Sequence, residues 1–461
     1  MTLIKSISGF RGTIGGSVGD NLTPIDIVEN TAAFGQWVLN KATGKASIVI
    51  GRDGRNTGKI VSDLVTGTLL SMGIDVIDTG LTTTPTLEMY VRKVNADGGI
   101  IFSASHNPMN WNALKLLNSE GEFISKSDGE ELLQLIVDRK IDFVDYASIG
   151  KLTNSTDSID YHISRVLEHP WVLKDEIRKK KFTIVVDCIN STGSISLIPL
   201  LEKLHCHVIA INDDISGKFS HDPEPLEKNL SELIQTVVRE NADLGISVDP
   251  DVDRVAFIRE DGKMFGEEYT IVAIAQYLLH KNLITNTVSN LSSTRALSDI
   301  TNKFNQKYHA SAVGEVNVVE MMKKQKSLFG GEGNGGVIVP ELHYGRDALI
   351  GTALFLSGMV HFDITPSDWK QKLPQYEMAK EKVKLVKGIN PDDILKKLER
   401  EYQSERLNTI DGLKIEFEDH WVHMRKSNTE PIIRIYTEGK SKDKAQAVAD
   451  KFKQKIMSFV K

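Results

Sequence analysis

The chain contains little cysteine and no long apolar segment. Cys188 and Cys206 are its only cysteines, so a disulfide framework is not expected and a reducing compartment fits. The most apolar long run, residues 349–362, is too short to span a bilayer and contains two glycines. The first residues reach serine and glycine before a signal-peptide apolar stretch can form. We therefore expect a cytoplasmic protein without a membrane partner.

An excess of one sign of charge is also missing. The chain has 56 Lys and Arg residues against 62 Asp and Glu residues, a formal net charge of −6. This balance argues against a nucleic-acid partner over the whole surface, although it allows a local basic cleft. The hydrophobic fraction of 40% and the aromatic fraction of 7% are ordinary for a soluble globular protein. The classes of protein that remain open are enzymes and ligand-binding proteins.

Length and strand pattern predict several domains. A prior of ~150 residues per domain gives about three or four for a chain of 461 residues. Short β-branched runs alternate with helical stretches in three successive units, and the last part of the chain has an α+β pattern. We expect an α/β fold with three similar mixed α/β domains around a central cleft plus a C-terminal α+β domain. The predicted boundaries are 1–150, 151–260, 261–372 and 373–461.

A polar loop follows the last predicted strand of each α/β unit. These strands are residues 99–102, 244–248 and 327–329. Ligands in open α/β sheets bind beyond the carboxyl ends of the strands. The three loops are therefore predicted to face one cleft, and their side chains are the first candidates for chemistry.

The loop after residues 244–248 carries Asp249, Asp251 and Asp253. Alternate side chains of an extended segment share a face, so the three carboxylates can converge on one hard cation such as Mg²⁺. A calcium-binding EF-hand is excluded, because Arg254 stands where that loop needs glycine and both flanks have strand character. The alternative is a solvated acidic turn, in which Arg254 would offset part of the repulsion.

The loop after residues 99–102 contains Ser-Ala-Ser-His-Asn-Pro at positions 103–108. Ser105 at a strand end could be a hydroxyl nucleophile, with Lys115 as a movable cation. A plain turn is the alternative, since Asn-Pro is strong turn chemistry, and His106 could be a structural hydrogen-bonding partner. Nearby, the turn at 51–55 has a structural character, with Asp53 placed to pair with an arginine.

Two further loops have the composition of sugar and phosphate sites. Residues 330–336 contain five glycines, and Glu332 and Asn334 could bond to vicinal sugar hydroxyls. No Gly-Lys-Ser/Thr follows, so a P-loop is not supported. A turn between predicted C-terminal strands offers a phosphate clamp made of Arg425, Ser427, Asn428, Thr429 and Arg434. A flexible hairpin and a solvated surface turn are the respective alternatives, and Arg11 is a weaker phosphate candidate.

Taken together, the chain resembles the α-D-phosphohexomutases over essentially its whole length. The family's phosphoserine loop, Thr-Ala-Ser-His-Asn-Pro, is similar to residues 103–108, and its metal loop, Asp-Gly-Asp-x-Asp-Arg, is similar to residues 249–254. Its phosphate-binding motif, Arg-x-Ser-x-Thr-Glu-Pro, is matched at residues 425–431. Arg11 and Lys115 fall where the family places its active-site arginine and lysine.

The sugar-binding loop departs from the family pattern Gly-Glu-x-Ser-Gly-His. Glu332 is retained, but Asn334 replaces the serine and Gly336 replaces the histidine. Our hypothesis is that His343, from the following loop, replaces that histidine. The Gly-Glu-Gly-Asn-Gly-Gly form resembles an archaeal-type branch assigned as phosphoglucosamine mutases.

The resemblance implies a two-step phosphoryl transfer. Phosphorylated Ser105 would phosphorylate a hexosamine monophosphate to a 1,6-bisphosphate, and the other phosphate would return to the serine. The implied cofactors are Mg²⁺, bound by the three aspartates and a phosphoserine oxygen, and glucose or glucosamine 1,6-bisphosphate as activator. Lys115, Arg11 and His106 would act in catalysis. The implied substrate contacts are Glu332, Asn334, Arg254 and His343, and the phosphate contacts are Arg425, Ser427, Asn428, Thr429 and Arg434.

Two other functions stay open at this point. A phosphomannomutase or phosphoglucomutase of the same family would need the same motifs. A non-catalytic sugar-phosphate sensor could share the domains but would have no use for a phosphorylatable Ser105. The sequence leaves the oligomeric state open.

Overall fold

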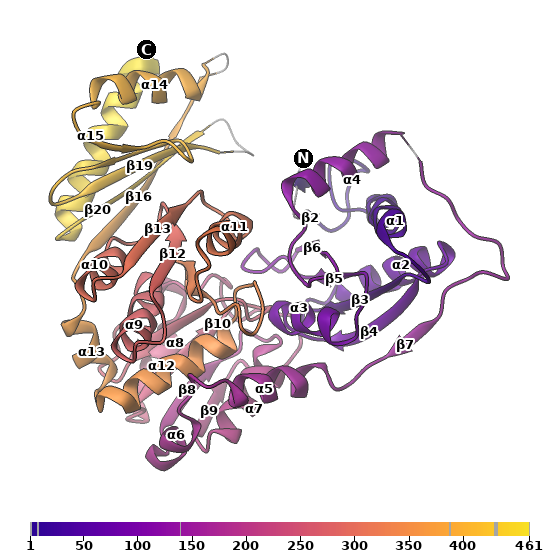
Figure 1. Cartoon of the computed structure of the whole chain (residues 1–461), viewed down its shortest axis with the longest axis horizontal. Coiled ribbons are helices and arrows are strands. Elements are labelled where there is room, and N and C mark those ends of the chain that lie inside the picture. Colours follow the sequence, from indigo (N-terminus) through magenta and orange to yellow (C-terminus); the bar gives the residue numbers. More distant parts are fainter. Residues whose placement is uncertain (1, 7–8, 139, 387–388, 428–431, 461) are drawn as a thin grey trace. The chain divides into compact units, whose positions relative to one another are not determined.

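The computed structural model describes residues 2–6, 9–138, 140–386, 389–427 and 432–460 (Figure 1). The chain divides into two compact units. Unit 1 comprises Met1–Thr270 and Gly335–Asp368, and unit 2 comprises Ile271–Asn334 and Trp369–Lys461. The chain therefore returns to unit 1 for the segment that follows the glycine-rich loop.

The first sheet of unit 1 has seven strands in the order β1-β2-β6-β5-β3-β4-β7. Strands β5, β3, β4 and β7 run parallel, whereas β6 pairs antiparallel with both β5 and β2. The elements are β1 (Ile4–Ser6), β2 (Gly9–Thr13), α1 (Pro24–Lys41), β3 (Ser47–Arg52), α2 (Gly58–Ser71), β4 (Asp75–Leu81), α3 (Thr84–Lys93), β5 (Gly98–Phe102), β6 (Trp111–Leu117), α4 (Lys126–Asp138) and β7 (Leu152–Asn154).

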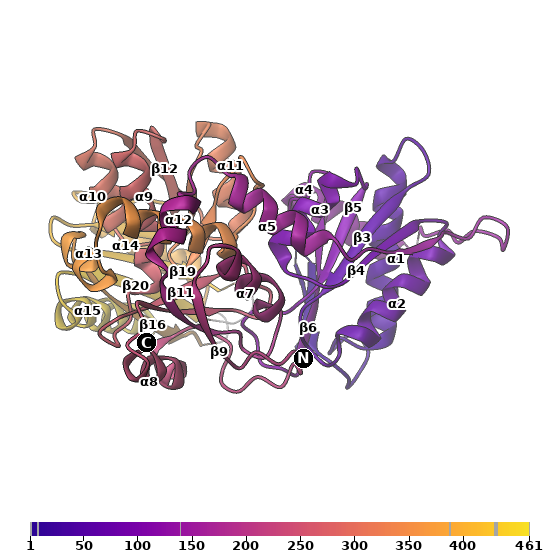
Figure 2. The ribbon, with the colours of Figure 1, turned by 90° about the horizontal axis from the view of Figure 1, so that it is seen from below.

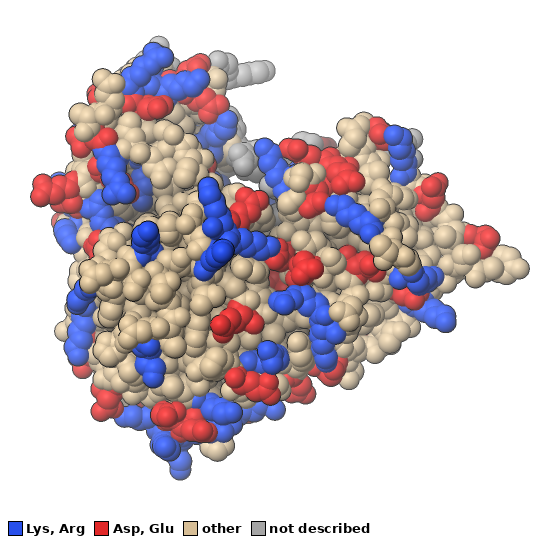
Figure 3. All heavy atoms as spheres, in the orientation of Figure 1, with Lys and Arg blue, Asp and Glu red and all other residues tan. Residues whose placement is uncertain are grey.

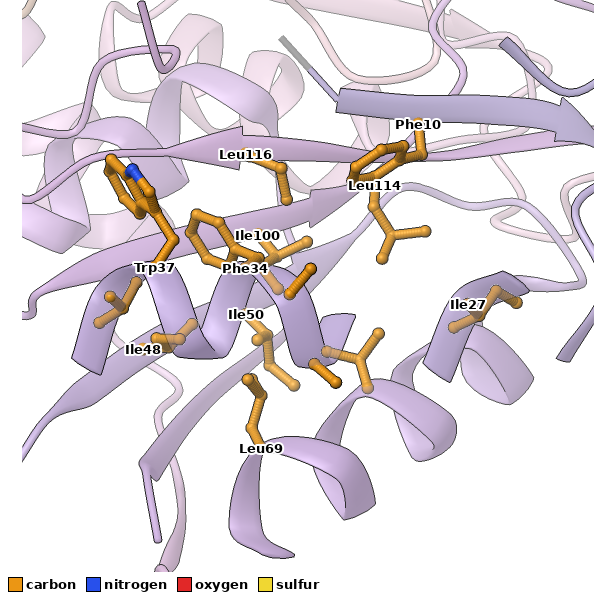
Figure 4. Packing of buried hydrophobic residues seen from close by; sticks show 14 of the residues in the cluster. Phe10, Ile27, Phe34, Trp37, Ile48, Ile50, Leu69, Ile100, Leu114 and Leu116 are labelled. Carbon is orange, nitrogen blue, oxygen red and sulfur yellow. The ribbon is translucent and has the colours of Figure 1, made fainter. Parts of the chain in front are cut away.

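Helices cover both faces of this sheet. Successive residues of a strand point to opposite faces, so an apolar strand can pack against both helix layers. Ile48 and Ile50 of β3 pack in one cluster with Phe34 of α1 and with residues of α2 and α4 (Figure 4). Val49, between them, packs in a second cluster with Leu87 of α3. Figure 2 shows α1 and α2 beside β3 and β4 with α3 on the other side. The apolar run of β3 thus follows from burial on both faces.

The second sheet of unit 1 has the order β11-β10-β8-β9. Strands β10, β8 and β9 are parallel and β11 is antiparallel to β10. Strand β10 lies inside the sheet and is fully buried, and the chain that leaves it begins with Asp249. The elements are α5 (Ser158–Glu168), α6 (Lys174–Lys180), β8 (Thr183–Asp187), α7 (Gly193–Lys203), β9 (His207–Ile211), η1 (Glu227–Asn229), α8 (Ser231–Arg239), β10 (Leu244–Val248), β11 (Val255–Arg259), β15 (Gly336–Ile338) and α12 (Ala348–Phe362).

Unit 2 combines the parallel strands β13, β12 and β14 with the antiparallel C-terminal sheet β16-β20-β19-β18-β17. Buried polar contacts join the two parts. Lys414 donates to the Leu291 carbonyl (2.9 Å), and Arg295 donates to the Phe417 carbonyl (2.9 Å). The elements are α9 (Glu267–His280), which begins in unit 1, β12 (Asn286–Asn290), α10 (Ala296–Lys303), β13 (Lys307–Ser311), α11 (Glu315–Gln325), β14 (Gly330–Glu332), α13 (Pro366–Lys372), β16 (Glu377–Lys384), α14 (Pro391–Glu401), β17 (Arg406–Asn408), β18 (Leu413–Glu416), β19 (Trp421–Lys426), β20 (Ile432–Gly439) and α15 (Lys442–Val460).

The predicted fold class is confirmed: three regions of mixed α/β sheet precede a C-terminal sheet domain. The strand expected at residues 327–329 is wrong, because the strand is β14, formed by the first residues of the glycine-rich stretch. Gly330 pairs with Val288, and a Cβ on it would lie 2.6 Å from the Met322 sulfur. The glycine therefore lets α11 pack closely on this strand. Because glycine has a low strand propensity, propensity alone does not predict β14.

No single helix in the described part of the chain is long and apolar enough to cross a membrane, and one bent pair, α12 with α13, passes by length and composition alone. Residues from Ala348 to Met359 of α12 are all buried. Acidic and basic side chains are intermixed on the face drawn in Figure 3. This distribution agrees with the small net charge of −6.

The packing of Phe34 between α1 and the first sheet can be tested by truncation. Phe34 is fully buried and its ring stacks on Trp37 at a centroid distance of 5.6 Å. We expect Phe34→Ala to lower the free energy of unfolding by about 3–5 kcal/mol in urea denaturation, because it leaves a cavity in the core. Ile25→Ala on the same helix is the control, since Ile25 is 62% exposed. Equal losses in both variants would contradict the assigned packing.

Candidate active site

Ser105 lies just beyond the carboxyl end of β5, in a strained part of its loop. Its φ is +48°, a left-handed conformation that a non-glycine residue adopts at a cost. The backbone N–H donates to Ser103 Oγ (2.9 Å), and Ser105 Oγ donates to Asp249 Oδ2 (2.5 Å). Ser105 is only 7% exposed. The structure thus brings the predicted nucleophile and the predicted metal loop into direct contact within unit 1.

The loop around Ser105 is held by one buried arginine. The Arg55 guanidinium is fully buried and donates to the carbonyl oxygens of four loop residues: Ser105 (2.5 Å), Asn107 (2.7 Å), Pro108 (2.7 Å) and Trp111 (3.1 Å). A lysine has no planar fork with which to reach four acceptors. Arg55 is therefore the main link between the turn after β3 and the loop after β5.

Asp53 completes this support. Its Oδ2 lies 3.1 Å from Arg55 Nε and accepts the Ser103 hydroxyl (2.7 Å). Burial raises the pKa of Asp53, and the neighbouring Arg55 charge offsets only part of that effect. The sequence predicted correctly that Asp53 pairs with an arginine. It did not show that Arg55 holds the serine loop, since the four acceptors are backbone carbonyls without a residue signature.

The loop after β10 folds around its first aspartate. Asp249 Oδ1 accepts the backbone N–H groups of Asp253 and Arg254, both at 3.1 Å. All three aspartates are buried, and one carboxylate oxygen of each lies within 4.8 Å of the others. Asp251 Oδ1 and Asp253 Oδ1 are buried and accept no hydrogen bond from any described residue.

The electrostatics of this triad call for a cation. Burial first, and then the charges of Asp253 and Asp251, raise the pKa of Asp249 well above its usual value. Oxygen atoms that converge without donors fit a hard divalent ion, which would offset the mutual repulsion. The residues present therefore fit Mg²⁺, and a plain solvated turn does not agree with their burial.

Two cationic side chains contact the far side of the triad. Lys115 Nζ lies 2.6 Å from Asp251 Oδ2 and 3.5 Å from Asp253 Oδ2. Arg346 Nη2 donates to Asp253 Oδ2 at 2.8 Å. Burial alone would lower the pKa of Lys115, but the two carboxylates outweigh it and raise the pKa. Lys115 is therefore an ammonium ion at neutral pH. Sequence reasoning missed Arg346, which reaches the triad from a different segment of the chain.

The other predicted catalytic residues of unit 1 lie close by. His106 Nδ1 lies 3.4 Å from Ser105 Oγ, and burial followed by the Arg254 charge lowers the pKa of His106 to about 3. The imidazole is thus neutral at physiological pH. Arg254 Nε lies 3.6 Å from Asp253 Oδ1. Arg11 of β2 pairs in register with Ala113 of β6, on the strand that carries Lys115.

Unit 2 contains the predicted sugar and phosphate residues. Glu332 is buried and accepts the Asn290 amide at 2.8 Å, and Asn334 Nδ2 lies 3.4 Å from the same carboxylate. Arg425 and Arg434 pair in register on β19 and β20. The backbone N–H of Ser427 donates to the Ile432 carbonyl at 3.0 Å. Asn428 and Thr429 lie outside the described residues, so the complete phosphate clamp stays a prediction.

His343 lies in a buried cluster of unit 1 and not in the glycine-rich loop. Its Nδ1 is 2.8 Å from Glu88 Oε2, and its Nε2 is 3.3 Å from Asp347 Oδ2. Contact with a substrate would require the imidazole to leave one of these carboxylates. The hypothesis that His343 replaces the missing family histidine therefore stays a prediction.

Four domain families match the chain in order along its length. They are the alpha/beta/alpha domains I, II and III of phosphoglucomutase/phosphomannomutase, at residues 4–141, 160–262 and 266–376, and the C-terminal domain at 377–455. The chain is 33% identical to the phosphoglucomutase/phosphomannomutase of Thermococcus kodakarensis, over 94% of this chain and 95% of that protein. It is 31% identical to the phosphoglucosamine/phosphogalactosamine mutase of Sulfurisphaera tokodaii, over 95% and 96%.

Solved structures share the fold. A phosphoglucomutase/phosphomannomutase family protein from Burkholderia thailandensis has a TM-score of 0.85 at 22% identity, covering 99% of this chain and 97% of that chain. The N-acetylphosphoglucosamine mutase of Aspergillus fumigatus, solved in complex with GlcNAc-6P and magnesium, has a TM-score of 0.54 at 15% identity, covering 91% and 84%.

The support of the serine loop by Arg55 gives a direct prediction. In Arg55→Met, the four carbonyls lose a buried donor, so we expect amide hydrogen exchange across residues 103–111 to accelerate at least about tenfold. Arg52→Met is the matched control, because Arg52 is the last residue of β3 and, among the described residues, its guanidinium donates to the Asp53 carbonyl alone. Unchanged exchange in the loop of the Arg55 variant would show that other contacts hold it.

Proposed function

Because the chain belongs to the phosphoglucomutase/phosphomannomutase family and is an isomerase of the mutase type, we propose that it interconverts glucosamine 6-phosphate and glucosamine 1-phosphate. The reaction runs through a phosphoserine at Ser105 and a 1,6-bisphosphate intermediate. The observation that carries this proposal is the 2.5 Å contact between Ser105 Oγ and Asp249 Oδ2 inside a buried loop.

The first step transfers a phosphoryl group without net hydrolysis. The bond between phosphorus and Ser105 Oγ breaks while a bond forms to the free hydroxyl oxygen of the sugar phosphate, and the proton of that hydroxyl is transferred to the released Ser105 oxygen. The second step reverses this with the other phosphate of the bisphosphate. Such transfers need positioning and charge stabilisation more than covalent help from the protein. The fixed Ser105 loop supplies the positioning.

The residues around Ser105 divide these tasks. Asp249, Asp251 and Asp253 would hold Mg²⁺, which neutralises charge on the transferring group when it is bound. Lys115 is charged, so it stabilises negative charge and does not serve as the first proton acceptor. Neutral His106 beside Ser105 can accept a hydrogen bond, and its lowered pKa makes it a weak proton acceptor. Arg11 adds a further cation for the substrate phosphate.

Recognition of the substrate is assigned to unit 2 and to Arg254. Glu332 and Asn334 would bond to sugar hydroxyls that both orientations of the intermediate present. The non-transferring phosphate would be held by Arg425, Ser427, Asn428, Thr429 and Arg434, with guanidinium forks and hydroxyl donors. The domain boundaries given above and an activating hexose 1,6-bisphosphate belong to the same proposal.

A second substrate class has specific support. The Thermococcus relative, at 33% identity, carries the name phosphoglucomutase/phosphomannomutase. The Sulfurisphaera relative, at 31%, carries an amino-sugar name. We favour the amino sugar because of the Gly-Glu-Gly-Asn-Gly-Gly loop, in which Asn334 offers a carboxamide near Glu332.

The phosphoserine mechanism predicts a simple chemical signature. The purified protein should carry one phosphoryl group on Ser105, detected by intact mass and peptide sequencing. Ser105→Ala should lack that group and lose mutase activity by more than about 10³-fold, because the transferred group then has no attachment site. Ser127→Ala, on the exposed face of α4, is the control. Full activity in the Ser105 variant would refute the mechanism, and sugar-phosphate binding without turnover in the wild type would favour a sensor.

The substrate preference is tested by comparing kcat/KM for the 6-phosphates of glucosamine, glucose and mannose. We expect glucosamine 6-phosphate to exceed the other two by at least about tenfold, the discrimination that one well-placed polar contact provides. Asn334→Ser, which restores the family residue, should reduce that ratio. If the wild type prefers glucose or mannose 6-phosphate, the chain belongs to the phosphoglucomutase/phosphomannomutase substrate class. That result would leave the proposed phosphoserine step unaffected.

A further inference from the structure

Unit 1 contains a second group of side chains that could bind a metal ion. This group shares no residue with the aspartate triad. It consists of His162 on α5, His343 in the segment between β15 and α12, and Asp347 at the start of α12. All three residues are buried, with at most 2% of each exposed. We propose that His162 Nε2, His343 Nε2 and Asp347 Oδ2 bind a structural zinc ion.

The distances between the ligand atoms fit a single ion. Asp347 Oδ2 lies 2.9 Å from His162 Nε2 and 3.3 Å from His343 Nε2. Ligand atoms bound at ~2.0–2.1 Å in a tetrahedral zinc site lie about 3.3 Å apart. The two imidazole rings are perpendicular, with centroids 6.3 Å apart, and each brings its Nε2 to the same aspartate oxygen. Small movements of these side chains would complete the coordination.

The outer contacts of the cluster orient each ligand in the way that zinc sites require. His343 Nδ1 lies 2.8 Å from Glu88 Oε2, and His162 Nδ1 lies 2.8 Å from Thr86 Oγ1. Asp347 Oδ1 accepts the N–H groups at the start of α12 (2.8 and 3.3 Å), which leaves Oδ2 for the histidines. Histidine ligands to zinc almost always donate their other ring nitrogen to a carboxylate or another acceptor.

Charge balance also favours an ion. Glu88 and Asp347 are two buried carboxylates, and charges removed from bulk solvent need compensation. Zinc would offset both charges while the imidazoles stay neutral. The competing arrangement is an imidazolium at His343, whose pKa the contacts with Asp347 and Glu88 raise to about 9 against the effect of burial. Two imidazoles with one carboxylate form a ligand set typical of zinc.

The proposed ion would have a mechanical role. It would join α5 to the start of α12, and through Glu88 it would also hold α3. The chain approaches Glu88 so closely that a Cβ on Gly345 would lie 1.7 Å from its carboxylate oxygen. The neighbouring Arg346 bonds to Asp253 of the aspartate triad at 2.8 Å. Zinc at this position therefore fixes the arginine that supports the proposed magnesium site.

The test measures zinc in the full-length protein. The chain is produced with zinc in the medium and dialysed against excess Mg²⁺, so that the aspartate triad does not retain zinc. Zinc is then counted by mass spectrometry and examined by X-ray absorption. We expect about one tightly held zinc per chain, with two imidazoles in its coordination shell. Removing it with a chelator should lower the Tm by at least about 2 °C.

Matched variants locate the ion. His162→Gln and His343→Gln should each lose the zinc, whereas His309→Gln on β13 of unit 2 should retain it. If a variant does not fold, the absorption spectrum of the wild type decides alone. Less than about 0.1 zinc per chain in the wild type, or a coordination shell without imidazole, would overturn the proposal. Zinc retained equally in the folded His162 and His343 variants would also overturn it. Neither outcome bears on Ser105 phosphorylation.

Discussion

The burial of three carboxylates after β10 is the constraint on which the site depends. Carboxylates removed from water are unfavourable unless donors or cations compensate them. Here the compensation comes from four separate segments: Ser105, Lys115, Arg346 and the loop's own N–H groups. The same concentration of buried negative charge is what allows this loop to hold a cation. The requirement for compensation thus draws the catalytic parts of unit 1 together.

The position of Ser105, the proposed nucleophile, also depends on buried hydrogen bonds and a buried ion pair. Ser105 has a positive φ and is held by hydrogen bonds to Ser103 and Asp249, and Arg55 donates to its carbonyl and to three further backbone carbonyls. A loop held in this way loses little entropy when it meets a substrate, which is how rigid sites lower the barrier to transfer. The ion pair with Asp53 is required because an unpaired buried guanidinium would be costly.

Candidate site residues that lie close together in the sequence could be predicted from the sequence. Asp249, Asp251 and Asp253 are close in sequence, and Ser105 follows a recognisable strand, so both loops could be identified from spacing. Arg55 acts on backbone carbonyls that carry no sequence signal, and Arg346 reaches Asp253 from 93 positions further along the chain. The same limit applies to His343, because no sequence signal indicated that Glu88 and Asp347 lie beside its ring. The strand β14 was misplaced because two glycines hide its strand character.

By itself the sequence determined the fold class and the family, and it predicted a nucleophile loop and a metal loop, because alternating hydrophobicity and short motifs depend on local spacing. Only the tertiary structure decided that Ser105 touches Asp249, that Lys115 contacts Asp251, and that a histidine pair shares one aspartate oxygen. These properties depend on burial and on distances between segments up to 185 positions apart. Desolvation and contact arise when the chain folds, so they have no counterpart in the order of residues.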